Sequence, residues 1–261
     1  MKKIRAFVDT TILADVLLKT GPLHETAKSA LKRFDRTSLP VYAIKEWKRG
    51  QLATYILYHN HLARTRSWSE TNQIIARWFG SPRRLSTARE ADAIAVLRIP
   101  PKVSVQNWDL ELAEHYRFAL KTLIYEAWEQ RREFTTETIF NLDCYVEAAP
   151  RDKRNGEIDP APQDCSGDRE CCLAGSLRER REMLVKLRES IPAAGRENNA
   201  RAKALGRLIS HPNLPFDRKQ CRALGDAYFS IFAPDDSVIL TTNLKDHQPL
   251  AAAVGKTAVG P

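Results

Sequence analysis

The sequence predicts an α/β fold in which both ends of the chain build a short, mostly parallel sheet, with a largely helical insertion between them. Ile4 to Val8 form a short apolar run with β-branched members, which is typical of a buried strand. Ser237 to Asn243 form a second such run near the other end. Each run is followed by a predicted helix. In open parallel sheets, ligands bind at the edge where such strands end.

The predicted helices follow from apolar residues at three- and four-residue spacing. A first helix begins near Thr10 or Thr11, directly after Asp9. The segment that starts SLPVY leads into a long helix that carries Glu46 and runs to about Leu62. The other helices are Leu23–Phe34, Trp68–Phe79, Thr87–Leu97, Leu110–Glu133, Leu177–Glu189, Ala200–Leu208, Asp217–Phe232 with Asp226 on it, and one from about Asp246.

The length of 261 residues allows one large domain or a core with a sizeable insertion. We expect a discontinuous domain made of residues 1–99 and 216–261, interrupted by a mainly helical insertion over 100–215. Within the insertion, residues 148–168 are charged and rich in turn formers, which predicts an exposed, flexible loop.

The charge balance favours polyanionic partners, because 41 Lys and Arg against 32 Asp and Glu give a formal net charge of +9. The N-terminal apolar run is interrupted by Asp9 and Asp15, which fits neither a secretory signal nor a membrane span. These features predict a soluble, cytoplasmic protein that does not enter membranes.

The five cysteines predict free thiols rather than a disulfide framework, because their number is odd. Their spacing contains no C-x-x-C pair, and two adjacent cysteines suit one tetrahedral zinc ion poorly. They are Cys144, Cys165, Cys171, Cys172 and Cys221.

Acidic and amide side chains at the predicted element ends suggest a site for a divalent cation. Hydrolysis of a phosphodiester needs an activated water and shielding of negative charge, tasks commonly given to Mg²⁺ or Mn²⁺. Mg²⁺ prefers hard oxygen ligands and keeps several waters, so a few converging carboxylates suffice. The candidates are Asp9, Glu46, Asp226, Asn243 and Asp246.

Three segments together resemble the PIN domain family of metal-dependent nucleases, in particular its VapC-like toxin branch. FVDTTILADVLL resembles the family's opening strand and helix, and SLPVYAIKEWKRGQL resembles its helix with an acidic residue. GDAYFSIFAPDDSVILTTNLKDH resembles the closing block, in which an Asp on a helix precedes a strand and Thr-Asn-x-x-Asp. The resemblance covers about residues 1–63 and 216–255 and implies a three-layer α/β/α fold.

The resemblance also implies roles for particular residues. Asp9, Glu46 and Asp226 match the family's metal-binding acids, whereas Asn243 and Asp246 match its variable fourth position and the neighbouring helix residue. Thr242 matches the hydroxyl residue that commonly precedes them. The chain departs from the family pattern at two positions, with Thr11 where Asn is common and His247 where Phe is usual.

The implied activity is endonucleolytic cleavage of RNA with Mg²⁺ or Mn²⁺, as in toxin-like members of the family. Such members commonly cut single-stranded RNA rather than DNA, form homodimers and bind an antitoxin or another inhibitor protein.

Two alternatives remain open. Asp92, in EADAIAVL, resembles the same helix motif as Asp226 but is followed by no Thr-Thr-Asn strand end. The chain could also be a catalytically weak PIN-like module that binds nucleic acid or a protein, with the helical insertion as its interaction surface.

Overall fold

A computed structural model of the chain describes residues 5–17, 21–78, 106–142, 144–160, 171–192, 196–211, 216, 221 and 223–261. It divides into two compact units. The first unit comprises residues 1–45, 132–146 and 163–261, and the second comprises 46–131 and 147–162. The division expected from the sequence, a discontinuous domain of residues 1–99 and 216–261 with an insertion over 100–215, stays a prediction.

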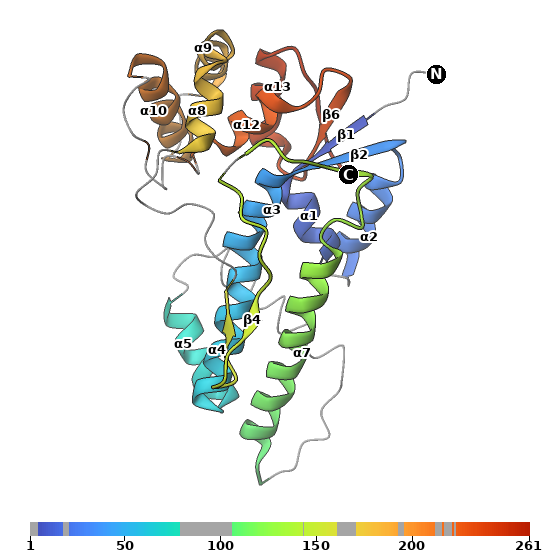
Figure 1. The fold of residues 1–261 in the computed structure, drawn as a ribbon, viewed down its shortest axis with the longest axis vertical. Coiled ribbons are helices and arrows are strands. Elements are labelled where there is room, and N and C mark those ends of the chain that lie inside the picture. Colours follow the sequence, from blue (N-terminus) through green and yellow to red (C-terminus); the bar gives the residue numbers. More distant parts are fainter. Residues whose placement is uncertain are drawn as a thin grey trace. The chain divides into compact units, whose positions relative to one another are not determined.

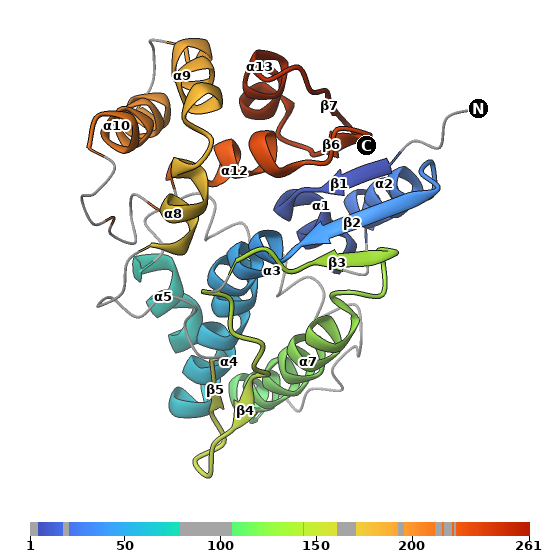
Figure 2. The same ribbon diagram turned by 45° about the horizontal axis from the view of Figure 1, so that its top comes forward.

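The first unit contains the sheet, and the chain is an α/β protein. Within the described residues, five strands form one sheet in the order β3-β2-β1-β6-β7, and every neighbouring pair is parallel (Figure 2). The strands are β1 (Arg5–Val8), β2 (Arg36–Pro40), β3 (Glu137–Ile139), β6 (Ser237–Leu240) and β7 (Ala258–Val259). The two strands predicted from the sequence, β1 and β6, are therefore confirmed and lie side by side.

The connections leave β1 and β6 in opposite directions along the sheet. The chain passes from β1 through α1 (Thr10–Leu17) and α2 (Gly21–Leu31) to β2 on one side. From β6 it passes through α13 (Leu244–Ala253) to β7 on the other side. Parallel crossovers are almost always right-handed, so helices that serve opposite directions cover opposite faces. The carboxyl ends of β1 and β6 thus form a topological switch point, where ligands of open α/β sheets bind.

Strand β3 was not predicted, because residues 137–139 were expected inside a helical insertion. Paired threonines hold it against β2: the Thr37 amide donates to Thr136 Oγ1 at 2.9 Å, and the Thr136 amide donates to the Thr37 carbonyl at 2.9 Å. The sheet therefore draws one strand from the middle of the chain, and it is not built by the chain ends alone.

An aromatic cluster fixes α12 (Gly225–Phe232) to the sheet. The ring centroids of Phe7 and Phe229 are 5.9 Å apart, and those of Tyr42 and Tyr228 are 4.8 Å apart. All four side chains are almost fully buried. Because aromatic pairs at these separations contribute packing beyond their buried area, the start of α12 is held close to β1.

Three further helices of the first unit lie before α12 in the sequence. They are α8 (Cys172–Arg178), α9 (Arg181–Ser190) and α10 (Arg196–Ser210). They confirm the helices predicted over 177–189 and 200–208, with an extra break between α8 and α9. The beginning of the helix predicted at Asp217 lies outside the described residues.

The second unit is mainly helical. Its helices α4 (Ala53–Thr65) and α7 (Trp108–Gln130) run side by side (Figure 1). An apolar stripe at four-residue spacing on α7, formed by Tyr116, Leu120, Ile124 and Trp128, is buried and belongs to the core of this unit. The unit also contains α5 (Trp68–Trp78), and a π-helical turn over Lys48–Leu52 joins α4 to α3 (Val41–Trp47), which begins in the first unit.

Part of the loop predicted over 148–168 has regular structure. Strands β4 (Arg151–Asp152) and β5 (Ile158–Asp159) form an antiparallel pair. The Asn60 side chain on α4 accepts from the Ile158 amide at 2.7 Å and donates to the Ile158 carbonyl at 2.8 Å. The expected flexible loop is thus fixed to a helix over its described part, although most of its residues are exposed as predicted.

None of the described helices combines the length and apolar character that crossing a membrane requires.

Candidate functional site

The register of the sheet brings Asp9 and Thr241 together at the switch point. Val8 pairs with Leu240, and the Asp9 amide extends the ladder by donating to the Leu240 carbonyl at 3.0 Å. Asp9 and Thr241 are therefore the next residues on two adjacent parallel strands. Thr241 Oγ1 donates to Asp9 Oδ2 at 2.7 Å, and both residues are buried.

The Asp9 carboxylate lies at the start of α1 and accepts further hydrogen bonds there. The Thr10 amide donates to Oδ1 at 2.7 Å, and Thr11 Oγ1 donates to Oδ2 at 2.8 Å. These bonds fix the orientation of the carboxylate at the first turn of α1. Among the described residues, however, no lysine or arginine comes within ion-pair distance of Asp9.

Asp226 lies in the first turn of α12, two residues before Tyr228 of the aromatic cluster. Its Oδ2 forms an ion pair with Nη2 of Arg201, which comes from α10. The Arg201 side chain is only 9% exposed and that of Asp226 is 26% exposed, so this pair is largely shielded from solvent. The favourable position of an acid near a helix N-terminus adds to its stabilisation.

Asp246 lies in the first turn of α13 and is shared by two partners. Nη2 of Arg201 is 3.5 Å from its Oδ2, and Asn243 Nδ2 donates to the same oxygen at 2.9 Å. The backbone N–H of Asn243 donates to Thr241 Oγ1 at 2.9 Å. Asn243 and Thr241 therefore connect the carboxylate of Asp246 to that of Asp9 through one chain of hydrogen bonds.

His247 lies between two of the carboxylates. Its Nε2 is 3.7 Å from Oδ2 of Asp9 and 3.4 Å from Oδ1 of Asp226. Its ring packs edge-on against Phe229, with centroids 5.6 Å apart. The side chain is 2% exposed, and no described residue offers Nδ1 a hydrogen bond. A buried polar atom of this kind is rare in folded proteins and marks a place where a ligand or water is expected.

The charges of the site act on one another. Burial raises the pKa of Asp226 above its usual value, while His247 and Arg201 lower it and the carboxylates of Asp9 and Asp246 raise it. Three carboxylates thus lie near one another, and the guanidinium of Arg201 contacts those of Asp226 and Asp246. The described part of the site keeps a negative charge that a cation could offset.

Four of the five predicted site residues are brought together, namely Asp9, Asp226, Asn243 and Asp246. Glu46 is the sixth residue of α3 and belongs to the second unit, so its membership of the site stays a prediction. The competing acid Asp92 lies outside the described residues. The match of Thr242 to the family's hydroxyl residue stays a prediction; Thr242 is exposed, whereas the preceding Thr241 contacts Asp9.

Two residues of the site were not found from the sequence. His247 appeared only as a departure from the family pattern, although Asn243, Asp246 and His247 have the i, i+3, i+4 spacing that places side chains on one helix face. Arg201 has no local signal, because it is one of many basic residues on α10 and its partners lie far away in sequence.

In the described residues, no three Asp, Glu, His or Cys side chains converge closely enough to hold a metal ion. Arg201 contacts both Asp226 and Asp246 and therefore occupies the space next to the oxygens that would have to turn toward a cation. The donor set itself, carboxylate oxygens with nearby hydroxyls and one imidazole, fits Mg²⁺ or Mn²⁺.

Comparison with known proteins assigns no relative to the chain. No family model, curated protein or solved structure matches it.

Proposed function

We propose that this protein is a metal-dependent nuclease with a PIN-like, three-layer α/β/α architecture, and that it cleaves RNA phosphodiester bonds. The main supporting observation is that Asp9, Asp226 and Asp246, from three distant segments, gather where β1 and β6 end. A fold of this class serves many functions, so the proposal depends on these carboxylates rather than on the sheet.

The cation would be Mg²⁺ or Mn²⁺, held by Asp9, Asp226 and Asp246 with water completing the coordination. Glu46 is expected as a further ligand, as the sequence resemblance implies. When bound, such a cation supplies an activated water and offsets charge on the phosphate in the transition state.

The protein's own residues orient these acids. Thr11 and Thr241 hold the Asp9 carboxylate through hydroxyl donors, and Asn243 holds that of Asp246. The guanidinium of Arg201 pairs with Asp226 and Asp246 when no cation is present. A cation that took these carboxylates would release Arg201, whose planar fork suits a phosphate.

The proposed substrate class and partners follow from the resemblance and the charge. Single-stranded RNA is preferred over DNA, and a net charge of +9 favours binding of its phosphates. A toxin-like role, a homodimer and an antitoxin or other inhibitor protein belong to the same proposal.

The test compares labelled single-stranded RNA and DNA incubated with the protein in Mn²⁺, Mg²⁺ or chelator. Asp9→Asn is expected to lose more activity than the ~10- to 100-fold that removal of a supporting residue costs. Asp35→Asn is the matched control, because Asp35 is exposed and lies outside the site. Cleavage that survives both chelator and Asp9→Asn would end the nuclease assignment.

A second function, a catalytically weak module that binds nucleic acid or protein, is favoured by the ion pairs of Arg201. A guanidinium fixed between Asp226 and Asp246 neutralises acids that a nuclease needs. Binding of single-stranded RNA without cleavage, unchanged by Mn²⁺ and by Asp9→Asn, would select this alternative.

A further inference from the structure

Asp9, Asp226 and Asp246 are called the aspartate cluster below. A cavity of about 280 Å³ adjoins this cluster at Asp246. It lies where the end of α9, the side of α10 and the first turns of α13 meet, all within the first unit. Arg201 and Asp246 belong both to the cavity wall and to the aspartate cluster. A molecule in the cavity would therefore lie next to the place where the proposed cation binds.

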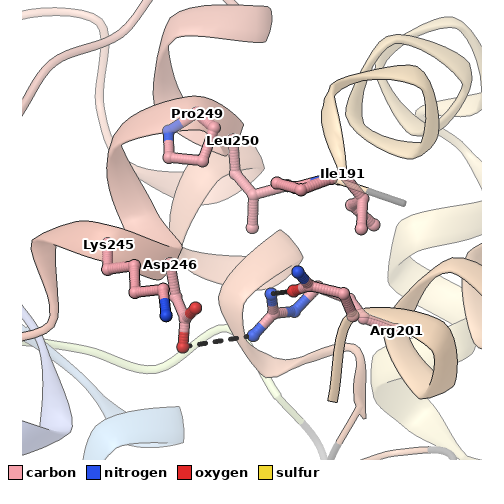
Figure 3. A pocket seen from close by; sticks show the side chains of 8 residues that line it. Ile191, Arg201, Lys245, Asp246, Pro249 and Leu250 are labelled. Carbon is pink, nitrogen blue, oxygen red and sulfur yellow. Dashed lines mark hydrogen bonds and ion pairs between the residues drawn. The ribbon is translucent and has the colours of Figure 1, made fainter. Parts of the chain in front are cut away.

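The wall has one charged side and one apolar side (Figure 3). Arg201, Lys245 and Asp246 lie on the charged side, and Arg201 points toward Asp246. Ile191 and Leu250 are on the other side together with Pro249. Asn198 adds an amide, whose Oδ1 accepts from Arg201 Nη1 at 3.2 Å.

The charged side favours a phosphate. The guanidinium of Arg201 is nine-tenths buried and donates to Asn198 Oδ1, a bond that does not depend on the two carboxylates. Lys245 is exposed and adds a second positive charge to the wall of the cavity. The carboxylate of Asp246 opposes an anion, but hydrogen bonding from Asn243 and the charge of Arg201 already offset part of its charge.

The apolar side favours a flat, weakly polar group. Ile191, Pro249 and Leu250 offer aliphatic surface, on which a heterocyclic base can lose water at little cost. The volume lies just below the range of about 300 to 1,000 Å³ for small-molecule sites, which suits one nucleotide rather than a longer segment.

We propose that this cavity binds one nucleotide, with its phosphate at Arg201 and Lys245 and its base against Ile191, Pro249 and Leu250. The inference deepens the proposed function, on which it rests, because the bound unit would be the nucleotide next to the cleaved bond of the RNA. Arg201 couples the two sites: a cation on Asp226 and Asp246 frees the guanidinium for the phosphate. By linkage, cation and nucleotide then strengthen each other's binding.

The experiment measures binding of nucleoside 5′-monophosphates by calorimetry, in chelator and in Mn²⁺. These probes contain no phosphodiester, so the readout needs no cleavage. Inorganic phosphate and the matching nucleosides are measured beside them to separate the two sides of the cavity. We expect the monophosphates to bind more tightly than either fragment, and more tightly in Mn²⁺ than in chelator.

Two variants examine the two sides. Lys245→Glu is expected to weaken monophosphate binding about tenfold or more, as loss of a charge-assisted contact does. Lys28→Glu is the matched control, because Lys28 is an exposed lysine of α2 outside the cavity, and it should leave binding unchanged. Ile191→Trp, which fills the apolar side, should weaken binding of monophosphates and nucleosides but not of inorganic phosphate.

Equal losses in Lys245→Glu and Lys28→Glu would overturn the inference, as would monophosphate binding no tighter than that of inorganic phosphate. Absence of monophosphate binding to the folded wild-type protein would also overturn it. RNA cleavage that requires Mn²⁺ and Asp9 would survive each of these results, so failure of the cavity and failure of the nuclease assignment are distinguishable.

Discussion

Replacing Arg201 by Met separates its ion pairs from the shape of its side chain. Methionine keeps an unbranched apolar stem but removes the guanidinium from Asp226 and Asp246. In chelator, the variant leaves the Asp226 carboxylate in surroundings that already raise its pKa, next to the charges of Asp9 and Asp246. The variant should therefore be less stable than the wild type.

The structure sets the size of this loss. Breaking a fully buried ion pair by removing one partner costs about 3 to 5 kcal/mol. The Asp226 side chain is 26% exposed and keeps His247 Nε2 at 3.4 Å, so its charge is only partly uncompensated. We expect a loss of about 2 to 3 kcal/mol in the free energy of unfolding, toward or below the lower end of that range.

Mn²⁺ should reverse much of this loss. A cation that binds the same carboxylates must displace Arg201 in the wild type but not in the variant. The stabilisation gained from saturating Mn²⁺ should therefore be larger in Arg201→Met by about the same 2 to 3 kcal/mol.

The assay is urea unfolding followed by circular dichroism, in chelator and in Mn²⁺. Arg181→Met on α9 is the matched control, because Arg181 is exposed and lies outside the site. If Mn²⁺ stabilises both variants and the wild type equally, the cation and Arg201 do not share ligands, and the reasoning is refuted.

Three further predictions each concern one residue. Thr241→Val should cost about 1 to 3 kcal/mol in the free energy of unfolding, because the Asp9 carboxylate and the Asn243 backbone N–H lose a buried partner. Thr242→Val, the control, should change this free energy little. Equal urea midpoints of the two variants would contradict the prediction. Burial raises the pKa of Asp226, so its folded form binds a proton more readily than the unfolded chain. In chelator, wild type should therefore gain stability relative to Asp226→Asn as the pH falls from neutral toward the unshifted value of 3.8, and a difference independent of pH would refute the shift. Burial lowers the pKa of His59 below 6.5, so the unfolded chain binds the proton more readily. Wild type should lose stability below that pH more steeply than His59→Gln, by up to about 1.4 kcal/mol per pH unit, and parallel pH profiles of the urea midpoint would exclude this.

The sequence predicted those helices and strands that are marked by a pattern of apolar residues within the element itself. The apolar run before Asp9, the run before Thr241 and the stripe along α7 each correspond to an element of the structure. Strand β3 escaped prediction because its three residues carry no period of their own. Its pairing with β2 depends on tertiary contacts, among them those of Thr37 with Thr136.

The site was predictable to the extent that its residues stand at element ends. Asp9, Asp226 and Asp246 could be chosen from their order along the chain. The choice between Thr241 and Thr242 could not, because it depends on register, and a shift of one residue turns a side chain to the opposite face. Arg201 was hidden for a different reason, since an ion pair between distant segments leaves no pattern in either one.

The pairing of β1 with β6 has a consequence for synthesis in the cell. Asp9 leaves the ribosome 232 residues before Thr241, whose hydroxyl donates to its carboxylate. Contacts so far apart in sequence form slowly, since a long loop must close before they contribute. A nascent chain therefore cannot bring Asp9, Asp226 and Asp246 together before Asp246 has been synthesised.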